Sequence, residues 1–137
     1  MAQRSASTQR HPLVVAVATV AALLTWLVAD PVLGVDLEVL TTPGGDATRL
    51  VSAGAIVSST IIVGLLGWAL LAVLQRISGR GTTIWRWTAT TVALLSLAGP
   101  LTLAQTTAAT VVLTVLHVVV AAILLVALPV QGSAGRK

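Results

Sequence analysis

The residue best suited to chemistry in this sequence is a histidine inside a long apolar segment. His117 lies in TVLHVVVAAILLVALP, residues 114–129, which has no other ionisable side chain. Thr110, Thr114 and His117 follow at steps of four and three residues, so a helix would place them on one face, which Thr107 extends by a further step of three. An ionisable residue within an apolar span is by default a functional-site hypothesis. We call Thr110, Thr114 and His117 the polar stripe and treat it as the first candidate site.

Three kinds of role are open to His117. The first is structural: a neutral imidazole that forms a hydrogen bond with a serine, a threonine or a carbonyl on a neighbouring helix and so fixes helix register. The second is contact with a ligand or a lipid. The third is haem, metal or proton chemistry, but haem ligation by one histidine per chain needs a homodimer, and a proton relay needs a second titratable group. The structural role is favoured.

A cavity around His117 would need polar groups from other segments. Ser58, Ser59 and Thr91 are the candidates. Hydroxyls in membrane helices mostly bond to the carbonyl four residues earlier, so packing is the favoured role for each. Small residues let membrane helices approach closely, and we expect this of three glycines: Gly54, Gly64 and Gly67.

Composition indicates that a lipid bilayer surrounds these residues. The chain of 137 residues is 56% hydrophobic and 9% charged, whereas a soluble domain carries about 25% charged residues. A membrane-spanning helix needs about 20 apolar residues, and four such segments are predicted: residues 13–29, 50–74, 84–104 and 106–128. The expected fold is all-α, an integral membrane antiparallel four-helix bundle over residues 13–129, with disordered tails at 1–12 and 130–137.

Prolines mark the expected ends and bends of these spans. Pro31 is expected to end the first span and Pro129 the fourth, while Gly99-Pro100 is expected to kink the third or open it into a turn. A cleaved signal peptide is the alternative for the first span, but the apolar run exceeds the usual length of about 7–15 residues. Between the first two spans, VDLEVL alternates and TPGGD signals a turn, so a small hairpin or an extended loop is expected there.

Charged residues predict the orientation of the spans. With both termini in the cytoplasm, the 30–49 loop lies outside and holds all four acids and Arg49. The other seven of the eight basic residues lie inside, as the positive-inside rule requires: Arg4, Arg10, Arg76, Arg80, Arg86, Arg136 and Lys137. The net positive charge is thus explained by the orientation of a bacterial plasma membrane protein. No nucleic-acid partner is expected. The expected membrane-interface anchors are Trp26, Trp85, Trp87, Arg76, Arg80 and Arg86.

Four motifs give the chain a family resemblance. They are GVDLEV after the first span, GLLGWALLAVLQR at the end of the second, SLAGPL in the third and LHVVVAAILLVALP in the fourth. With these motifs the chain resembles an uncharacterised family of small four-span membrane proteins from actinobacteria, a domain of unknown function. The resemblance covers about residues 13–129 and implies a four-helix membrane fold with nothing catalytic. His117 falls on the family's fourth-span histidine, for which the resemblance implies no role.

The sequence contains no nucleophile–base pair, metal-ligand spacing, phosphate loop or dinucleotide motif. We therefore expect neither an enzyme nor a cofactor or metal. The favoured function is a structural or accessory membrane protein, or a self-assembling helix bundle, whose partners are the bilayer and a second copy or another membrane protein. The alternative is a small-molecule, lipid or ion binding or transport protein with a cavity around His117.

Overall fold

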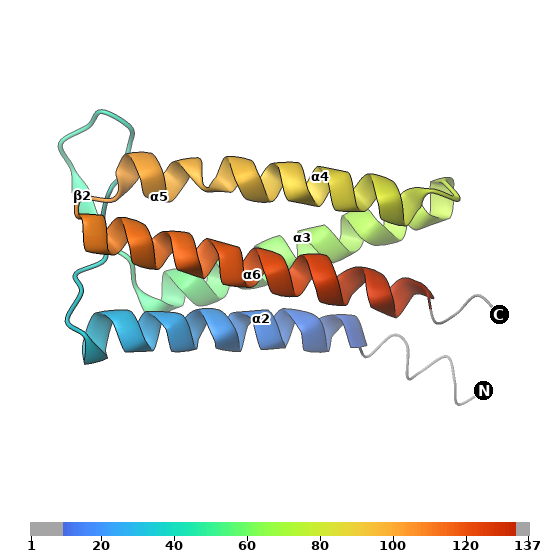
Figure 1. Ribbon diagram of the computed structural model, residues 1–137, viewed down its shortest axis with the longest axis horizontal. Helices are drawn as coiled ribbons and strands as arrows, with labels where there is room; N and C mark the ends of the chain where they lie inside the picture. Colours follow the sequence, from blue (N-terminus) through green and yellow to red (C-terminus); the bar gives the residue numbers. More distant parts are fainter. Residues whose placement is uncertain (1–9, 134–137) are drawn as a thin grey trace.

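The computed structural model describes residues 10–133, most of which are helical (Figure 1). Helix α2, Arg10–Leu27, continues into a π-helical turn η1, Val28–Val32. Two short strands follow, β1 at Glu38–Leu40 and β2 at Thr48–Leu50. The remaining helices are α3 at Ala53–Ile77, α4 at Gly81–Ser96, α5 at Ala98–Leu103 and α6 at Thr107–Ser133. Helix α2 thus begins before the predicted boundary and α6 ends after it; residues 1–9 and 134–137 of the predicted tails lie outside the described residues.

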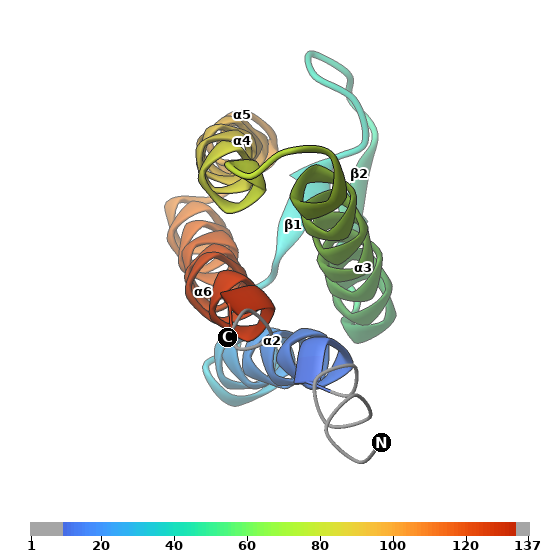
Figure 2. The same ribbon diagram turned by 90° about the vertical axis from the view of Figure 1, so that its right-hand side faces the viewer.

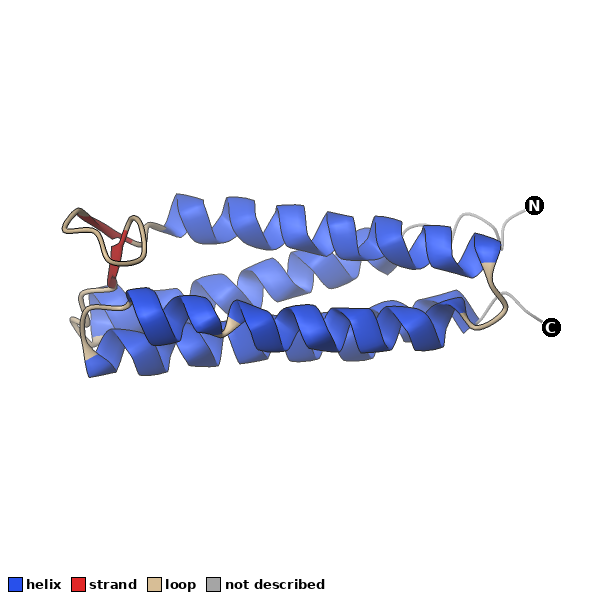
Figure 3. Cartoon of the chain, turned by 90° about the horizontal axis from the view of Figure 1, so that it is seen from above, coloured by secondary structure: helices blue, strands red, loops and turns tan. Residues whose placement is uncertain are grey.

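The helices lie lengthwise beside one another. α2 packs against α3 and α6, and α4 packs against the same two helices, so that α2 and α4 face each other across the bundle (Figure 2). The start of α2, the α3–α4 turn and the end of α6 lie at one end of the bundle, which we call the turn end (Figure 3). The two strands and the start of α6 lie at the other end, which we call the hairpin end (Figure 1).

Within residues 10–133, three helical segments are long and apolar enough to cross a membrane: His11–Val32, Ala53–Ile77 and Thr107–Pro129. The third predicted span, residues 84–104, is instead divided into α4 and α5 at Leu97. Pro100 explains where α4 ends, because proline has no amide to donate to the carbonyl of Ser96 and its ring crowds that carbonyl. The break matches the expected effect of Gly99-Pro100, and it leaves α4 with 16 residues.

The other two prolines do not end their helices as predicted. The chain passes Pro31 within η1, where Leu33 N–H donates to Val28 O over 2.9 Å, a five-residue step that the missing proline amide permits. The turn finishes at Gly34, whose φ of +66° suits glycine. Helix α6 passes Pro129 and continues to Ser133. Packed neighbours in a bundle help a helix to tolerate one missing hydrogen bond.

Buried side chains fill the bundle in three groups. The middle group is small: Ala22, Ile56 and Leu116. The group toward the turn end contains Val14, Ala18, Leu71, Trp85, Leu124 and Leu128. The group at the hairpin end contains Leu37, Val39, Ala109 and Leu113. Many large apolar side chains on the outer faces are exposed, as expected of helices whose surroundings are lipid.

The predicted small hairpin is present and closes one end of the bundle. β1 and β2 pair antiparallel, with Val39 opposite Arg49. Leu37, which is 1% exposed, and Val39, which is 9% exposed, point into the bundle. The hairpin is also fixed to the α5–α6 connection, because Gln105 N–H donates to Glu38 O over 3.1 Å. Burial of a leucine side chain contributes about 1.5–3 kcal/mol to folding, so Leu37 contributes substantially to holding the hairpin on the bundle.

At the turn end, the α3–α4 connection needs glycine at one position. A Cβ at Gly81 would overlap the backbone carbonyl of Leu74. Gly81 is buried, and its amide donates to Ser78 O over 3.0 Å. Gly79, two residues earlier, has open space where its Cβ would be.

We expect Gly81→Ala to lower the free energy of unfolding by about 1–3 kcal/mol, because the added methyl must displace backbone. Gly79→Ala is the matched control and is expected to change it by less than about 0.5 kcal/mol. The measurement is reversible unfolding of the detergent-solubilised protein, followed by helical circular dichroism. Equal stability of the two variants would contradict the assigned role of Gly81.

Candidate functional site

The polar stripe lies at the edge of the packed face of α6. Thr110, Thr114 and His117 are each half-buried, next to the buried Leu113 and Leu116. The valines that α6 exposes lie on the opposite side of the helix: Val111, Val115, Val118 and Val126. His117 therefore lies beside the bundle interior, at the boundary between packed and exposed surface.

His117 bonds to its own helix. Its Nδ1 lies 2.7 Å from the carbonyl oxygen of Leu113, one helical turn earlier. Because a carbonyl oxygen only accepts hydrogen bonds, Nδ1 carries the proton and Nε2 is the acceptor in the neutral ring. From the sequence we expected a partner on a neighbouring helix. The structure instead shows the local bond that serines and threonines form in membrane helices.

The hydroxyls chosen as cavity-lining candidates also bond to their own helices. Thr110 Oγ1 donates to Thr106 O over 3.0 Å, and Ser58 Oγ donates to Gly54 O over 2.8 Å. Ser59 Oγ donates to Ile56 O over 3.1 Å. Ser58, Ser59 and Thr91 are all exposed on the outer faces of α3 and α4. The structure therefore does not bring these three residues together with His117.

Thr114 is the member of the stripe whose side chain forms no hydrogen bond with its own helix. Its Oγ1 is buried and, within the part of the chain that the structure describes, has no hydrogen-bond partner. An unpartnered buried hydroxyl costs free energy. The buried Thr19 on α2 provides a contrast, because its Oγ1 donates to Val15 O over 2.9 Å.

We expect Thr114→Val to raise the free energy of unfolding by about 1 kcal/mol, because the change removes an unsatisfied hydroxyl and keeps the branched shape. Thr19→Val, which removes a bonded hydroxyl, is the matched control and is expected to give no gain. Chemical unfolding in a mixed detergent would measure both. A loss of stability in Thr114→Val would show that the hydroxyl has a partner, such as a ligand or another chain.

The three predicted packing glycines have different surroundings. A Cβ at Gly64 would lie 2.8 Å from Val15 Cγ1, so α2 and α3 touch closely there. The carbonyl of Gly67 accepts a hydrogen bond from Trp85 Nε1 over 2.7 Å. Gly54 is exposed, and a Cβ at this position would lie 3.9 Å from Ser52 Oγ, so the structure shows no close approach of another helix there.

The tryptophans predicted as interface anchors also differ. Trp87 is 73% exposed, whereas Trp85 is 1% exposed and lies within the bundle. Trp85 is therefore a core residue rather than an anchor, because its position on α4 faces α3. Trp26 is half-buried near the hairpin end and donates from Nε1 to Val51 O over 3.0 Å. Trp68 was missed: its ring stacks on His11, with centroids 5.3 Å apart, and no local motif relates these two residues.

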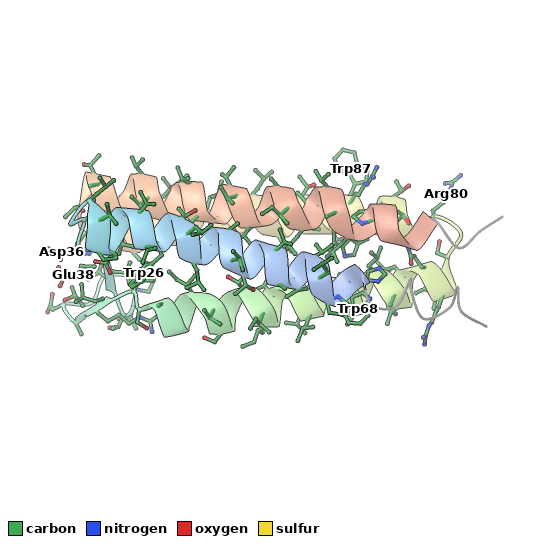
Figure 4. The ribbon with its side chains drawn as sticks, turned by 90° about the horizontal axis from the view of Figure 1, so that it is seen from below. Trp26, Asp36, Glu38, Trp68, Arg80 and Trp87 are labelled. Carbon is green, nitrogen blue, oxygen red and sulfur yellow. The ribbon has the colours of Figure 1, made fainter. Side chains whose placement is uncertain are left out.

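Acidic and basic side chains lie mostly at opposite ends of the bundle, although Arg49 of β2 lies with the acids. Asp36 and Glu38 lie at the hairpin end and Arg80 at the turn end (Figure 4). The predicted anchors Arg76 and Arg86 are exposed, like Arg80, and lie on the helices that flank the α3–α4 turn. The predicted basic residues at positions 4, 136 and 137 lie outside the described residues.

Two shallow depressions within residues 10–133 lie on outer faces of the bundle. One, on α4, is lined by Thr83, Arg86, Trp87 and Thr90. The other, on α2, is entirely apolar and is lined by Val20, Leu23, Leu24, Trp26 and Leu27. His117 lines neither of them. Among the described residues, no group of three or more histidines, cysteines, aspartates or glutamates could hold a metal ion.

The fold defines a small, mostly helical protein with three helices apolar enough to cross a membrane. The chain belongs to the DUF6069 family, a family of unknown function, whose model matches residues 2–134. This is consistent with the resemblance to a domain of unknown function. Neither the curated proteins nor the solved structures contain a match to the chain.

Proposed function

We propose that this protein is a four-span protein of a bacterial plasma membrane, with both termini in the cytoplasm. In this proposal it acts by packing against other membrane helices, as an accessory subunit or a self-assembling bundle, and catalyses no reaction. An actinobacterial source belongs to the same proposal and rests on the sequence motifs alone. The orientation and the mode of action have different support and need different tests.

The path of the chain supports a fourth crossing. α4 and α5 together run from the turn end to the hairpin end, beside α6 (Figure 1). Together with Leu97 they extend from Gly81 to Leu103, which is about the length that a span requires. A fourth crossing returns the start of α2 and the end of α6 to one side, in keeping with their common position in Figure 3.

The charges support the orientation. Arg76, Arg80 and Arg86 lie on and beside the α3–α4 turn, and a cytoplasmic turn end satisfies the positive-inside rule. The hairpin end, which carries the acids, then lies outside. Acids have little weight in this rule, so the arginines carry the argument.

Single cysteines test the orientation, because the chain has no cysteine of its own. Asp36 and Gly79 are exposed and lie at opposite ends of the bundle. We expect a membrane-impermeant thiol reagent to label Asp36→Cys in intact cells, and Gly79→Cys only after the membrane is opened. The reverse pattern would show that the protein has the opposite orientation. Labelling of both cysteines from outside would rule out a membrane crossing by α3, which lies between them.

The observation that carries the packing function is the interior. Apolar groups follow one another from the turn end to the hairpin end, and Leu37 and Val39 close the latter. The stripe residues Thr110 and His117 bond to their own backbone, so local bonds satisfy their polar groups. An interior of this kind has few polar groups available to bind a ligand. The exposed apolar faces are then the surfaces available for contact with other helices.

One observation favours the alternative function, a site for a small molecule, lipid or ion. The unpartnered Thr114 Oγ1 lies one turn before His117, on the same stripe. A ligand that donates to or accepts from both side chains would satisfy this hydroxyl. Such a ligand would have to enter from the exposed edge of α6, because the stripe borders that edge.

Native mass spectrometry in a mild detergent distinguishes these two functions. For the packing function we expect complexes that contain a second copy or another protein, and we expect His117→Leu to assemble as the wild type does. A single polypeptide at all concentrations would contradict it. A bound small molecule that is present in the wild type and lost in His117→Leu would establish the alternative.

A further inference from the structure

The depression on the outer face of α4 combines a cation, two hydroxyls and an indole. Thr83, Arg86, Trp87 and Thr90 line it, and their spacing of three, one and three residues keeps them on one side of the helix. Trp85, which lies between them in sequence, points the opposite way and is buried. α4 therefore carries two different tryptophan faces near the turn end, one packed and one open.

Among the side chains of residues 10–133, none with a negative charge lies near Arg86. The four acids of the chain occupy residues 30–46, at the hairpin end (Figure 4), whereas Arg86 lies near the start of α4. A helix of 16 residues is about 24 Å long, so most of that length separates Arg86 from them. An exposed guanidinium without a carboxylate partner leaves its planar array of donors available to phosphate.

Trp87 indicates the depth at which the depression lies. Its side chain is 73% exposed and extends beyond the ribbons of the bundle (Figure 4). Exposed tryptophans of membrane proteins are enriched where the hydrocarbon meets the headgroups. The depression therefore opens at headgroup depth, at the turn end, where Arg76, Arg80 and Arg86 are exposed.

We propose that this depression binds the headgroup of an anionic phospholipid. The guanidinium of Arg86 holds the phosphate oxygens, the hydroxyls of Thr83 and Thr90 supply further donors, and the ring of Trp87 lies along the glycerol and the first acyl carbons. The site rests on the membrane location in the proposed function, but it requires neither the proposed orientation nor self-assembly. Its failure would therefore leave those proposals untouched.

The test uses the full chain in a mild neutral detergent, titrated with phosphatidylglycerol or phosphatidylcholine. Retained lipid is counted by native mass spectrometry. We expect the wild type to prefer phosphatidylglycerol and Arg86→Gln to bind it about tenfold more weakly, because a charged hydrogen bond is lost. Arg80→Gln removes the same charge at the same end but outside the depression, and it is expected to weaken binding about twofold. Circular dichroism confirms that both variants are folded.

Three results would overturn the proposal. Equal losses in Arg86→Gln and Arg80→Gln would show that the turn end attracts anionic lipid without a specific site. Equal binding of the two lipids by the wild type would remove the role of charge. Complete displacement of phosphatidylglycerol by millimolar inorganic phosphate would indicate a site for free anions instead of a lipid.

Discussion

The constraint on which this structure depends is that polar groups inside an apolar bundle must find their partners within the bundle. Water is absent from the hydrocarbon core of a bilayer, and each unsatisfied backbone group there costs several kcal/mol. Most of the chain meets this constraint locally, since Thr19, Thr110 and His117 all bond to the carbonyl four residues earlier. The indole of Trp85 does so between helices, at Gly67 O. Thr114 Oγ1 is the exception within residues 10–133, which is why it marks the alternative function.

Because most of these polar side chains form hydrogen bonds within their own helix, the contacts between helices depend mainly on the fit of their shapes. α2 meets α3 where Gly64 admits the branched side chain of Val15, and α3 turns into α4 where Gly81 fits under the carbonyl of Leu74. Close approach at small residues is the usual basis of association between membrane helices, because lipid and leucine are equally apolar. The two glycines act differently, one at a helix contact and one within a turn.

Periodicity in the sequence predicted much of the fold, because the physical rules involved are local. VDLEVL alternates, and the structure indeed buries Leu37 and Val39 while Asp36 is exposed. The effect of proline was predictable only in part. Pro100 ended α4 at Ser96, as the lost hydrogen bond requires, but Pro31 and Pro129 lie inside helical segments. Packing by neighbouring elements decides between these outcomes, and single-sequence rules do not contain it.

Site residues were harder to predict, because their roles depend on helix phase and on distant partners. Trp85 and Trp87 are nearly adjacent in sequence, yet α4 buries one and exposes the other. Gly81 and Ala89, four residues on either side of Trp85, could have identified the packed face. The stacking of His11 on Trp68 joins the start of α2 to the second half of α3, and no local pattern encodes it. His117 was identified from the sequence, but its hydrogen-bond partner was expected on a neighbouring helix and is instead the carbonyl of Leu113 on its own helix.

The hairpin has a consequence for the order in which this protein is completed. Leu37 and Val39 pack against Ala109 and Leu113 of α6, and Glu38 O accepts from the amide of Gln105. A ribosome makes the hairpin long before it makes these partners. During synthesis Leu37 and Val39 therefore lack their partners on α6 until that helix has been made. The hairpin can thus close its end of the bundle only after α6, the last helix of the described residues, is in place.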